Sequence, residues 1–288
     1  MAEATVQPEQ ENWSEIIEPK TRLLDLRLKE LWRYRDLVLM FVRRDFVANY
    51  KQTILGPLWF FIQPLLTTLT YVLIFGRVAG LSTDGLPMLV FYLSGVTIWN
   101  YFAETLTKTA TVFKDNAQMF GKVYFPRLTM PFSIVISNLV RFGIQFFLFL
   151  LIWSWYYFGT DSLHPNWYIL LTPVLVLMMG LLALGLGMII SALTTKYKDL
   201  IFLLTFGVQL LMFATPVIYP LSTLPEKYKW IILANPISSI VETFRFAFLG
   251  TGVFRWDYFA YSGGMTIAIL LLGTIVFNRV EKSFTDTV

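Results

Sequence analysis

Six long stretches without charged residues constrain this chain more than any other feature of its sequence. Only the third is interrupted, by Arg141, and the stretches cover residues 52–76, 85–103, 128–160, 162–195, 200–225 and 258–278. A helix needs about 20 apolar residues to cross the hydrocarbon core of a bilayer. The pattern therefore predicts an all-α integral membrane protein with six transmembrane helices. Their expected centres lie near Thr67, Val96, Gln145, Met179, Leu210 and Ile267.

The amino-acid composition supports a membrane protein and excludes several other classes. Of the 288 residues, 56% are hydrophobic and 15% are charged, whereas soluble domains carry about 25% charged residues. There is no Cys and one His, His164, which excludes a disulfide framework, a Cys-ligated zinc site and a multi-His metal site within one chain. The net charge of +4 is too small to suggest a nucleic-acid partner.

Two shorter apolar runs predict a segment that enters the membrane without crossing it. Residues 230–241 and 246–254 are each too short to span as a helix. Asn235-Pro236 breaks the first run, and Glu242 and Arg245 separate the two runs. We therefore expect a re-entrant helical hairpin at residues 221–256, between the fifth and sixth spans.

The distribution of Lys and Arg predicts which side of the membrane each loop occupies. With the N-terminus in the cytoplasm, 17 of the 23 basic residues fall in the cytoplasmic pieces 1–57, 107–127, 194–199 and 279–288, and five fall on the opposite side. Cytoplasmic loops of membrane proteins carry the excess of Lys and Arg. Both termini are therefore expected in the cytoplasm, and residues 52–288 are expected to form the six-span domain.

The residues before the first span form two segments with different charge patterns. Residues 1–21 are acidic and have no apolar core, which predicts a flexible tail and no cleavable signal peptide. Residues 22–51 predict a basic amphipathic helix on the inner leaflet. Two interpretations of Arg43, Arg44 and Lys51 remain open. They anchor the helix to the membrane surface, or they meet an anionic head group at a substrate entrance, since Arg and Lys both bind phosphate.

The loop at residues 107–127 is large and interleaves apolar with charged residues. Pro126 begins the element that follows, which favours a short helix across the cytoplasmic base of the membrane domain. The residues of interest are Lys108, Lys114, Asp115, Asn116 and Lys122, together with Lys198 and Asp199 of the smaller loop on the same side. This loop is either a plain cytoplasmic connection with the usual positive charge or a docking helix for a soluble partner.

Arg141 is the one ionised residue deep inside a predicted span. A charge at this depth is unfavourable in lipid, so its side chain is expected to face protein or water. It either lines a translocation path or pairs with a neighbouring polar group. Aromatic residues near the span ends either form the usual interfacial belt or face a channel and stack on sugar rings. Trp59 and Phe142 are the aromatic channel candidates beside Arg141.

Several kinds of chemistry are missing from the sequence. The phosphate-binding pattern G-x-x-x-x-G-K-[ST] does not occur, because Gly121-Lys122 is followed by Val123 and residue 116 is Asn. Transport driven by ATP would therefore need a separate ATPase chain. No predicted span has a central acidic residue, which argues against a proton-driven transporter. We find no paired carboxylates, Ser-His-Asp set or metal-ligand spacing that would predict catalytic residues.

Five short motifs in the chain form a characteristic set. They are YKQTILGPLW at residues 50–59 with Gln63-Pro64, Phe125-Pro126-Arg127, Tyr197-Lys198-Asp199-Leu200, TPVIYP at residues 215–220, and Asn235-Pro236. Together they resemble the permeases of polysaccharide ABC exporters of the Wzm and TagG type. The resemblance runs from about residue 30 to the C-terminus.

This resemblance implies a homodimer that works with two copies of an ABC ATPase. ATP and Mg²⁺ would be bound by the ATPase, and no cofactor is expected on this chain. Residues 107–127 would form the coupling helix and residues 22–51 the interface helix. The outer gate at residues 221–256 would include Asn235, Pro236, Glu242 and Arg245. The substrate would be a lipid-linked polysaccharide of the O-antigen or teichoic-acid type, carried on a polyprenyl pyrophosphate across the inner membrane.

Three alternatives differ in what they require of the chain. An ABC permease for a drug or a small lipid would share the architecture and differ in its cargo. A membrane-bound glycan enzyme, such as a transferase or phosphatase, would require a carboxylate or His cluster near one interface. A non-enzymatic membrane scaffold would function without an ATPase partner.

Overall fold

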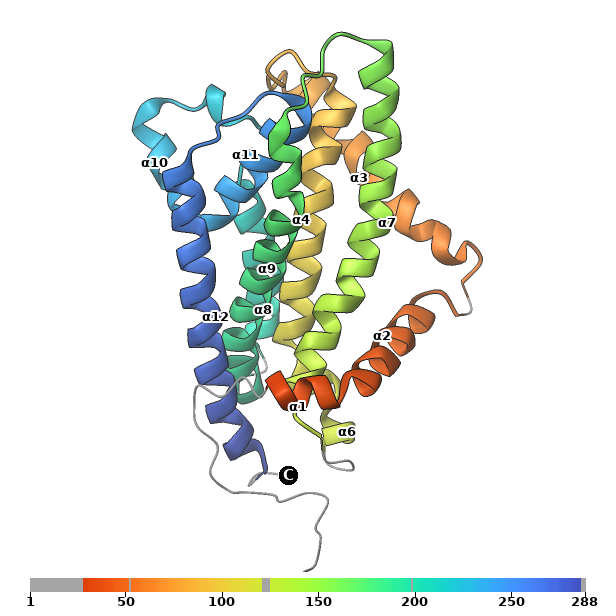
Figure 1. Ribbon diagram of the computed structural model, residues 1–288, viewed down its shortest axis with the longest axis vertical. Helices are drawn as coiled ribbons and strands as arrows, with labels where there is room; N and C mark the ends of the chain where they lie inside the picture. Colours follow the sequence, from red (N-terminus) through yellow and green to blue (C-terminus); the bar gives the residue numbers. More distant parts are fainter. Residues whose placement is uncertain (1–27, 52, 121–124, 198, 286–288) are drawn as a thin grey trace, which may run out of the picture.

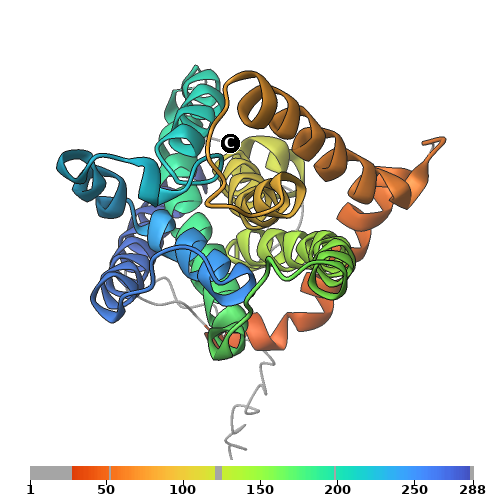
Figure 2. The same cartoon turned by 90° about the horizontal axis from the view of Figure 1, so that it is seen from above.

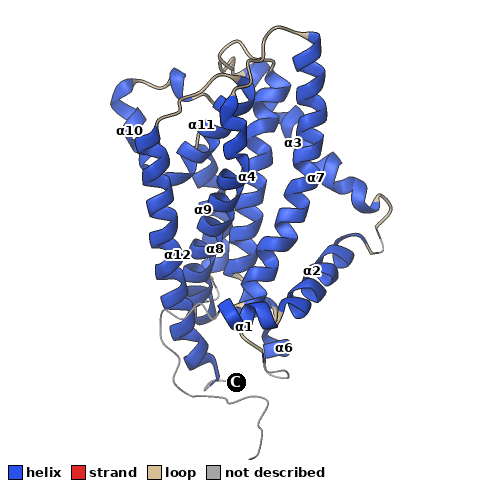
Figure 3. Cartoon of the chain, viewed as in Figure 1, coloured by secondary structure: helices blue, strands red, loops and turns tan. Residues whose placement is uncertain are grey.

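The protein is an all-helical bundle. The computed structural model describes residues 28–51, 53–120, 125–197 and 199–285, and this part of the chain contains helices and loops but no strand (Figure 3). The α-helices are, in chain order, α1 (Leu28–Arg33), α2 (Arg35–Tyr50), α3 (Trp59–Tyr71), α4 (Met88–Ala110), α5 (Val112–Asp115), α6 (Ala117–Phe120), α7 (Thr129–Gly159), α8 (Thr172–Lys196), α9 (Leu200–Phe213), α10 (Glu226–Ala234), α11 (Pro236–Leu249) and α12 (Trp256–Thr285). The predicted fold class is confirmed at this level.

Shorter helical segments extend three of these helices. A 3-10 turn, Gly56–Leu58, precedes α3, and a π-helix, Val72–Val78, continues it. A second 3-10 turn, η3 (Trp167–Leu171), leads into α8, and a third, Leu221–Thr223, precedes α10. Four continuous segments are long and apolar enough to cross a membrane: Gly56–Val78, Thr129–Gly159, Trp167–Lys196 and Trp256–Val280. They contain four of the six expected span centres.

The expected second span is α4, which is long but more polar than the other four. Seen from above, α4 lies in the middle of the bundle (Figure 2), and it packs against α3, α7, α8, α9 and α11. Every residue from Val90 to Trp99 is buried. Because protein surrounds this helix, Asn100 and Glu104 can find polar partners without contacting lipid. A test based on apolarity alone therefore does not identify α4 as a membrane span.

The expected fifth span, α9, is short because prolines follow it. Its 14 residues extend about 21 Å, less than the ~30 Å of a hydrocarbon core. Pro216 and Pro220 lack a backbone N–H, and each disfavours helical geometry in the residue before it. The chain therefore leaves the helix at Phe213 and forms an irregular turn whose residues 215–218 are buried.

α10 and α11 form a bent pair, with an angle of 105° between them at Asn235. The break falls where Asn235-Pro236 predicted it. Glu242 and Arg245 were expected to separate two short segments, and that expectation is wrong: both residues lie within the continuous helix α11. The charges do not interrupt the helix because they face each other one turn apart, at positions i and i+3.

The two ends of the bundle carry different accessory segments. α1, α6 and the C-terminal end of α12 gather at one end, and α10 and α11 lie at the other (Figure 1). α2 packs against α7, and the turn between α2 and α3 projects sideways from the bundle (Figure 1). α1, α6 and the C-terminal end of α12, which belong to segments predicted to face the cytoplasm, therefore share one end of the molecule.

Glycine allows the closest helix contact in the bundle. α8 and α12 pack together along much of their length, and Gly185 of α8 faces Gly273 of α12. A Cβ added to Gly185 would lie 2.8 Å from the Cα of Leu270, and one added to Gly273 would collide with the carbonyl oxygen of Gly185. Small residues let two helix backbones approach in this way in membrane proteins.

We expect Gly273→Ala to destabilise the protein because the methyl group would force α8 and α12 apart. Overpacking of this kind costs about 1–3 kcal/mol. Thermal unfolding of the purified protein in detergent measures the effect. Gly264→Ala, also on α12, is the matched control, because its added Cβ meets no atom of the described residues within 4 Å. It should be neutral or slightly stabilising, since Ala favours helix over Gly. Equal melting of Gly273→Ala and the parent protein would contradict the close contact.

Candidate functional site

Two of the residues expected at the outer gate, Glu242 and Arg245, form a buried ion pair on α11. The Arg245 guanidinium lies 3.4 Å from the Glu242 carboxylate, and each side chain is 1% exposed. The guanidinium also lies over the ring of Phe91 on α4, with 4.0 Å between Cζ and the ring centroid. Glu242 accepts a second hydrogen bond from the backbone N–H of Val253 at 3.2 Å. The two charges are therefore compensated inside the protein.

Arg245 holds the irregular turn that follows α9. Its guanidinium donates to the carbonyl oxygens of Pro216 and Val217, and to that of Tyr219 at 3.3 Å. Gly95 of α4 leaves room for this approach, because a Cβ there would lie 2.6 Å from the Val217 oxygen and 2.9 Å from Nη2 of Arg245. Non-helical backbone at membrane depth needs protein partners for its polar groups, and a forked donor supplies several at once.

Asn235 fixes the other end of the same turn. Its Oδ1 accepts a hydrogen bond from the N–H of Ile237 at 3.1 Å, which caps the first turn of α11. Its Nδ2 donates to Oγ1 of Thr215 at 2.9 Å and to the carbonyl of Ala214 at 3.3 Å. Pro236 occupies the first helical position, where its missing N–H leaves no bond unmade.

The C-terminal end of α11 is capped from α7 and from the loop between α7 and α8. The last four carbonyls of a helix lack partners within it, and here each has one. Asn166 Nδ2 bonds the Phe246 oxygen at 2.7 Å, and Asn166 N–H bonds that of Ala247 at 3.1 Å. Trp153 Nε1 bonds the Phe248 oxygen at 2.8 Å, and His164 N–H bonds that of Leu249 at 3.3 Å. α11 is thus anchored at both ends.

Sequence reasoning identified Asn235, Pro236, Glu242 and Arg245 but missed the residues that hold them. Phe91 and Asn166 come from distant parts of the chain, Val253 follows Glu242 by 11 residues, and no local pattern marks any of them. α11 is anchored at both ends, whereas α10 is tied to the bundle at its last residue, where the Tyr261 hydroxyl donates to the carbonyl of Ala234 at 2.9 Å. None of the nine residues of α10, all of which the structure describes, is buried.

A polar seam joins α4 to α7 around Arg141. The Arg141 guanidinium lies 2.8 Å from the Glu104 carboxylate, which shows that the charge pairs with a polar neighbour, one of the two interpretations left open. Asn138 donates to Thr105 Oγ1 at 3.1 Å, and Asn100 donates to Gln145 at 3.4 Å. Within the described residues, Nη2 of Arg141 and Oδ1 of Asn138 are buried without hydrogen-bond partners.

The three channel candidates do not share one surface. Arg141 lies against α3, with its guanidinium 5.5 Å from the ring centroid of Phe60. Trp59 begins α3 and is exposed. Phe142 turns the other way and packs its ring against that of Tyr101, with 5.4 Å between centroids. Successive helical residues point about 100° apart, so Arg141 and Phe142 belong to different faces of α7.

The coupling-loop residues lie at the end of the bundle that also carries α1 and α6. Val112 and Phe113 of α5 are buried, and Phe113 stacks on Phe277 of α12 with 4.7 Å between centroids. Lys114 and Asp115 are exposed beside this base. Lys108 is half-buried in the last turn of α4, and Asn116 caps the C-terminal end of α5. Asp199 is exposed before α9. Lys122 and Lys198 lie outside the described residues.

α2 and the residue that follows it carry buried apolar side chains and exposed basic ones. Val38 and Phe41 are buried, and Phe41 contacts the ring of Phe125, with 5.7 Å between centroids. Arg43, Arg44 and Lys51 are exposed. Arg44 is partly neutralised, because Asp45 accepts its hydrogen bonds at 2.8 and 3.0 Å. Exposed apolar side chains on the same helix are Leu39, Met40 and Val47.

The chain belongs to the ABC-2 type transporter family, whose model matches residues 36–249. The matched segment runs from α2 to the end of α11 and includes the polar seam and the anchored turn. The resemblance inferred from the five motifs is thereby confirmed. The protein is a multi-pass membrane transporter subunit, in agreement with its apolar helices.

Three relatives illustrate where the chain falls within this family. It is 28% identical over 254 residues to the O-antigen export system permease protein RfbA of Klebsiella pneumoniae, covering 87% of this chain and 94% of the relative. It is 29% identical over 263 residues to the RfbA permease of Myxococcus xanthus, with coverages of 91% and 98%. It is 21% identical over 243 residues to the polysialic acid transport protein KpsM of Escherichia coli, with coverages of 83% and 92%.

We expect Arg245→Met to destabilise the protein strongly. It would leave Glu242 buried without its counter-charge and three carbonyls without donors. Removing one partner of a buried ion pair costs about 3–5 kcal/mol. Arg245→Lys should recover only part of this loss, because an ammonium group lacks the fork that reaches separate carbonyls. Thermal and denaturant unfolding in detergent measure both variants.

Arg255→Gln is the control for Arg245→Met. Arg255 pairs with Asp257 at 2.6 Å, but both side chains are more than half exposed. Exposed ion pairs contribute about 0–1 kcal/mol, so this variant should unfold close to the parent protein. A lysine variant at position 245 that is as stable as the parent would show that the fork is unnecessary.

Proposed function

We propose that the chain is the transmembrane subunit of an ATP-driven exporter. It moves a lipid-linked polysaccharide of the O-antigen or teichoic-acid type, carried on a polyprenyl pyrophosphate, across the inner membrane. The observation that carries this proposal is family membership over residues 36–249, together with near full-length similarity to permeases named for O-antigen export. Those names favour a polysaccharide over a drug or small lipid.

The second part of the proposal concerns the arrangement in the membrane. α4 and α9 complete six spans with the four apolar segments, and both termini lie in the cytoplasm. α1 and α2 form an interface helix on the inner leaflet, which suits a helix with exposed basic and apolar residues. α10 and α11 form the outer hairpin. Because α11 is anchored at both ends and none of the residues of α10 is buried, α10 is the part that moves as a gate.

We further propose that two copies of this chain assemble through α3 and α9. These helices lie close together, since Tyr71 Oη is 3.3 Å from Met212 Sδ, and Figure 2 shows them on the same side of the bundle. Of the described residues of α9, only Leu204 is buried, and α3 buries only Pro64 and Thr68. A polar glycan needs a path shielded from lipid, which two such faces would enclose between them.

The coupling site is assigned to α5, α6 and the exposed start of α9. A docking surface for an ATPase must transmit force, and α5 rests on a packed aromatic base through Phe113, Phe277 and Phe120. Thr194 ties the ends of α8 and α4 together by donating to the carbonyl of Ala110 at 2.7 Å. ATP and Mg²⁺ bind to two copies of the partner ATPase.

Charge reversal in α5 tests this docking role. Lys114→Glu with Asp115→Lys should abolish co-purification of the ATPase in mild detergent and stop glycan export, because both exposed charges would repel a complementary surface. Membrane insertion and thermal stability should stay normal. Glu226→Lys with Lys227→Glu on α10 is the matched control at the opposite end of the bundle and should retain the ATPase.

Two outcomes of this experiment would count against different claims. If the α5 variant keeps both the ATPase and export, the docking role is wrong. If the unaltered protein brings down no stoichiometric ATPase under conditions that preserve other membrane complexes, the exporter function itself is wrong. The scaffold and enzyme alternatives would then return.

Replacing Arg43 and Arg44 with Gln tests the substrate entrance. Each basic residue near an anionic membrane surface contributes about 1 kcal/mol, so export at low substrate concentration should fall about tenfold. Arg43→Gln should account for most of the loss, since Asp45 already neutralises Arg44. Arg35→Gln, exposed on the first turn of α2, is the control. Unchanged export with both residues replaced would leave α2 as a surface anchor.

A further inference from the structure

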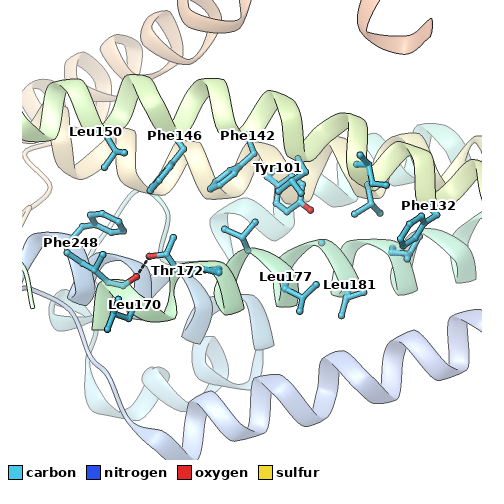
Figure 4. A pocket seen from close by; sticks show the side chains of 18 residues that line it. Tyr101, Phe132, Phe142, Phe146, Leu150, Leu170, Thr172, Leu177, Leu181 and Phe248 are labelled. Carbon is cyan, nitrogen blue, oxygen red and sulfur yellow. Dashed lines mark hydrogen bonds between the residues drawn. The ribbon is translucent and has the colours of Figure 1, made fainter. Parts of the chain in front are cut away.

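A large apolar groove runs between α7 and α8 on the side of the bundle (Figure 4). Its volume is about 840 Å³, within the range of small-molecule pockets, roughly 300–1,000 Å³. α7 and α8 form the two walls, Tyr101 of α4 lies at its back, and η3 with Phe248 of α11 closes the outer end. Of the channel candidates discussed above, only Phe142 lines this groove.

The apolar lining of the groove favours a hydrocarbon chain as its ligand. Among the described residues no charged side chain lines it, and the only polar side chains in the lining are Tyr101 and Thr172. Thr172 already donates its hydroxyl to the carbonyl of Ile169 at 2.6 Å (dashed line in Figure 4). A sugar or phosphate would lose its hydration there and could gain hydrogen bonds from only one further hydroxyl, that of Tyr101. An alkyl or isoprenoid chain would lose nothing.

Four aromatic residues of the lining, Tyr101, Phe142, Phe146 and Phe248, form one continuous wall. The rings of Phe142 and Phe146 are stacked with 5.5 Å between centroids, and Phe146 meets Phe248 edge-on at 5.7 Å. Phe142 rests in turn on Tyr101. Each ring supports the next, which prevents the wall from collapsing into the groove. The opposite wall is aliphatic and opens toward the bilayer, since Leu177 of α8 is 60% exposed.

The length of the groove distinguishes between kinds of hydrocarbon chain. On α7 the lining extends from Phe132 to Leu150, which is about 27 Å along the helix. On α8 it extends from Thr172 to Leu184, about 18 Å. Half of a bilayer core is about 15 Å, so an acyl chain from one leaflet would leave the groove partly empty. A chain that extends beyond its own leaflet would fill it.

The inner end of the groove adjoins the proposed entrance. Val135 lines the groove and also packs against the cluster that contains Phe41, on the buried side of α2. Arg43 and Arg44 are exposed on that same helix. A lipid whose charged head contacts α2 can therefore place its tail in the groove.

We propose that the groove between α7 and α8 binds the isoprenoid tail of the lipid-linked glycan while its pyrophosphate head is held at α2. This assignment rests on the proposed function and names a second site for the same substrate. The tail and the head are held by different helices. The groove therefore contributes affinity for the lipid carrier that is independent of the glycan attached to it.

Photo-crosslinking of the full transporter complex in phospholipid nanodiscs tests the groove. The probe is a polyprenyl pyrophosphate with a diazirine in its tail, and peptide mapping locates the adducts. Adducts are expected on α7 between residues 132 and 150 and on α8 between 172 and 184, and unlabelled polyprenyl pyrophosphate should compete with them. A phospholipid carrying a diazirine in its acyl chain is the comparison probe.

Leu139→Trp and Leu177→Trp fill the groove from its exposed walls. A Trp ring would displace at least two methylene groups of a bound chain, so labelling should fall about tenfold. Val140→Trp and Val174→Trp are the matched controls on the same helices, because both residues are similarly exposed, at 41% and 42%, and do not line the groove. They should label like the parent protein.

Four outcomes would overturn the assignment. Labelling that survives both groove-filling variants would place the tail elsewhere. Equal labelling by the phospholipid probe, without competition from polyprenyl pyrophosphate, would assign the groove to ordinary bilayer lipid. If the complex exports glycan but no adduct maps to the groove, the groove assignment fails while the exporter function stands. If no ATPase co-purifies and no glycan is exported, the proposed function fails and the groove assignment fails with it.

Discussion

The hydrogen bonds of Arg245 to the turn after α9 are the interaction on which the rest of this structure depends. α9 ends at Phe213, and the turn that follows it carries backbone carbonyls that are buried inside the protein, away from water. Arg245 reaches the carbonyls of Pro216, Val217 and Tyr219, and Glu242 and the ring of Phe91 compensate its charge. Without that donor, the broken helix would carry unsatisfied polar groups into an apolar environment.

Hydrogen bonds also anchor α11 at both of its ends. Asn235 caps one end of α11, and Asn166, Trp153 and His164 satisfy the carbonyls at the other. The packed centre of the molecule is α4 with the helices around it. The segments with few buried residues, namely α3, α9 and α10, surround that centre. A transporter needs helices that can move and a packed core that holds them in place.

Several features of the fold and the site were predictable from local sequence because their causes are local. Long apolar runs predicted four of the membrane helices, and Asn235-Pro236 predicted the break before α11. α4 appeared among the predicted spans but is more polar than the others, because its polar side chains are matched by residues of α7. Arg141 and Glu104 are 37 positions apart, so their pairing leaves no local pattern in the sequence.

The error at Glu242 and Arg245 has the same origin. Two charges in a short apolar segment suggest a boundary when each is considered alone. In the folded chain they neutralise each other one helical turn apart, and carbonyls 26 to 29 residues away complete the coordination of Arg245. For Lys122 and Lys198, which lie outside the described residues, only the sequence-based prediction stands.

The sequence by itself determined that this chain is a helical membrane protein, because hydropathy acts residue by residue. Its short motifs were enough to indicate the transporter family. Only the tertiary structure decided which charges are buried in pairs, which helix is anchored, and that α7 and α8 leave a groove between them. Those properties depend on contacts between residues far apart in the chain, and such contacts exist only once the helices have packed.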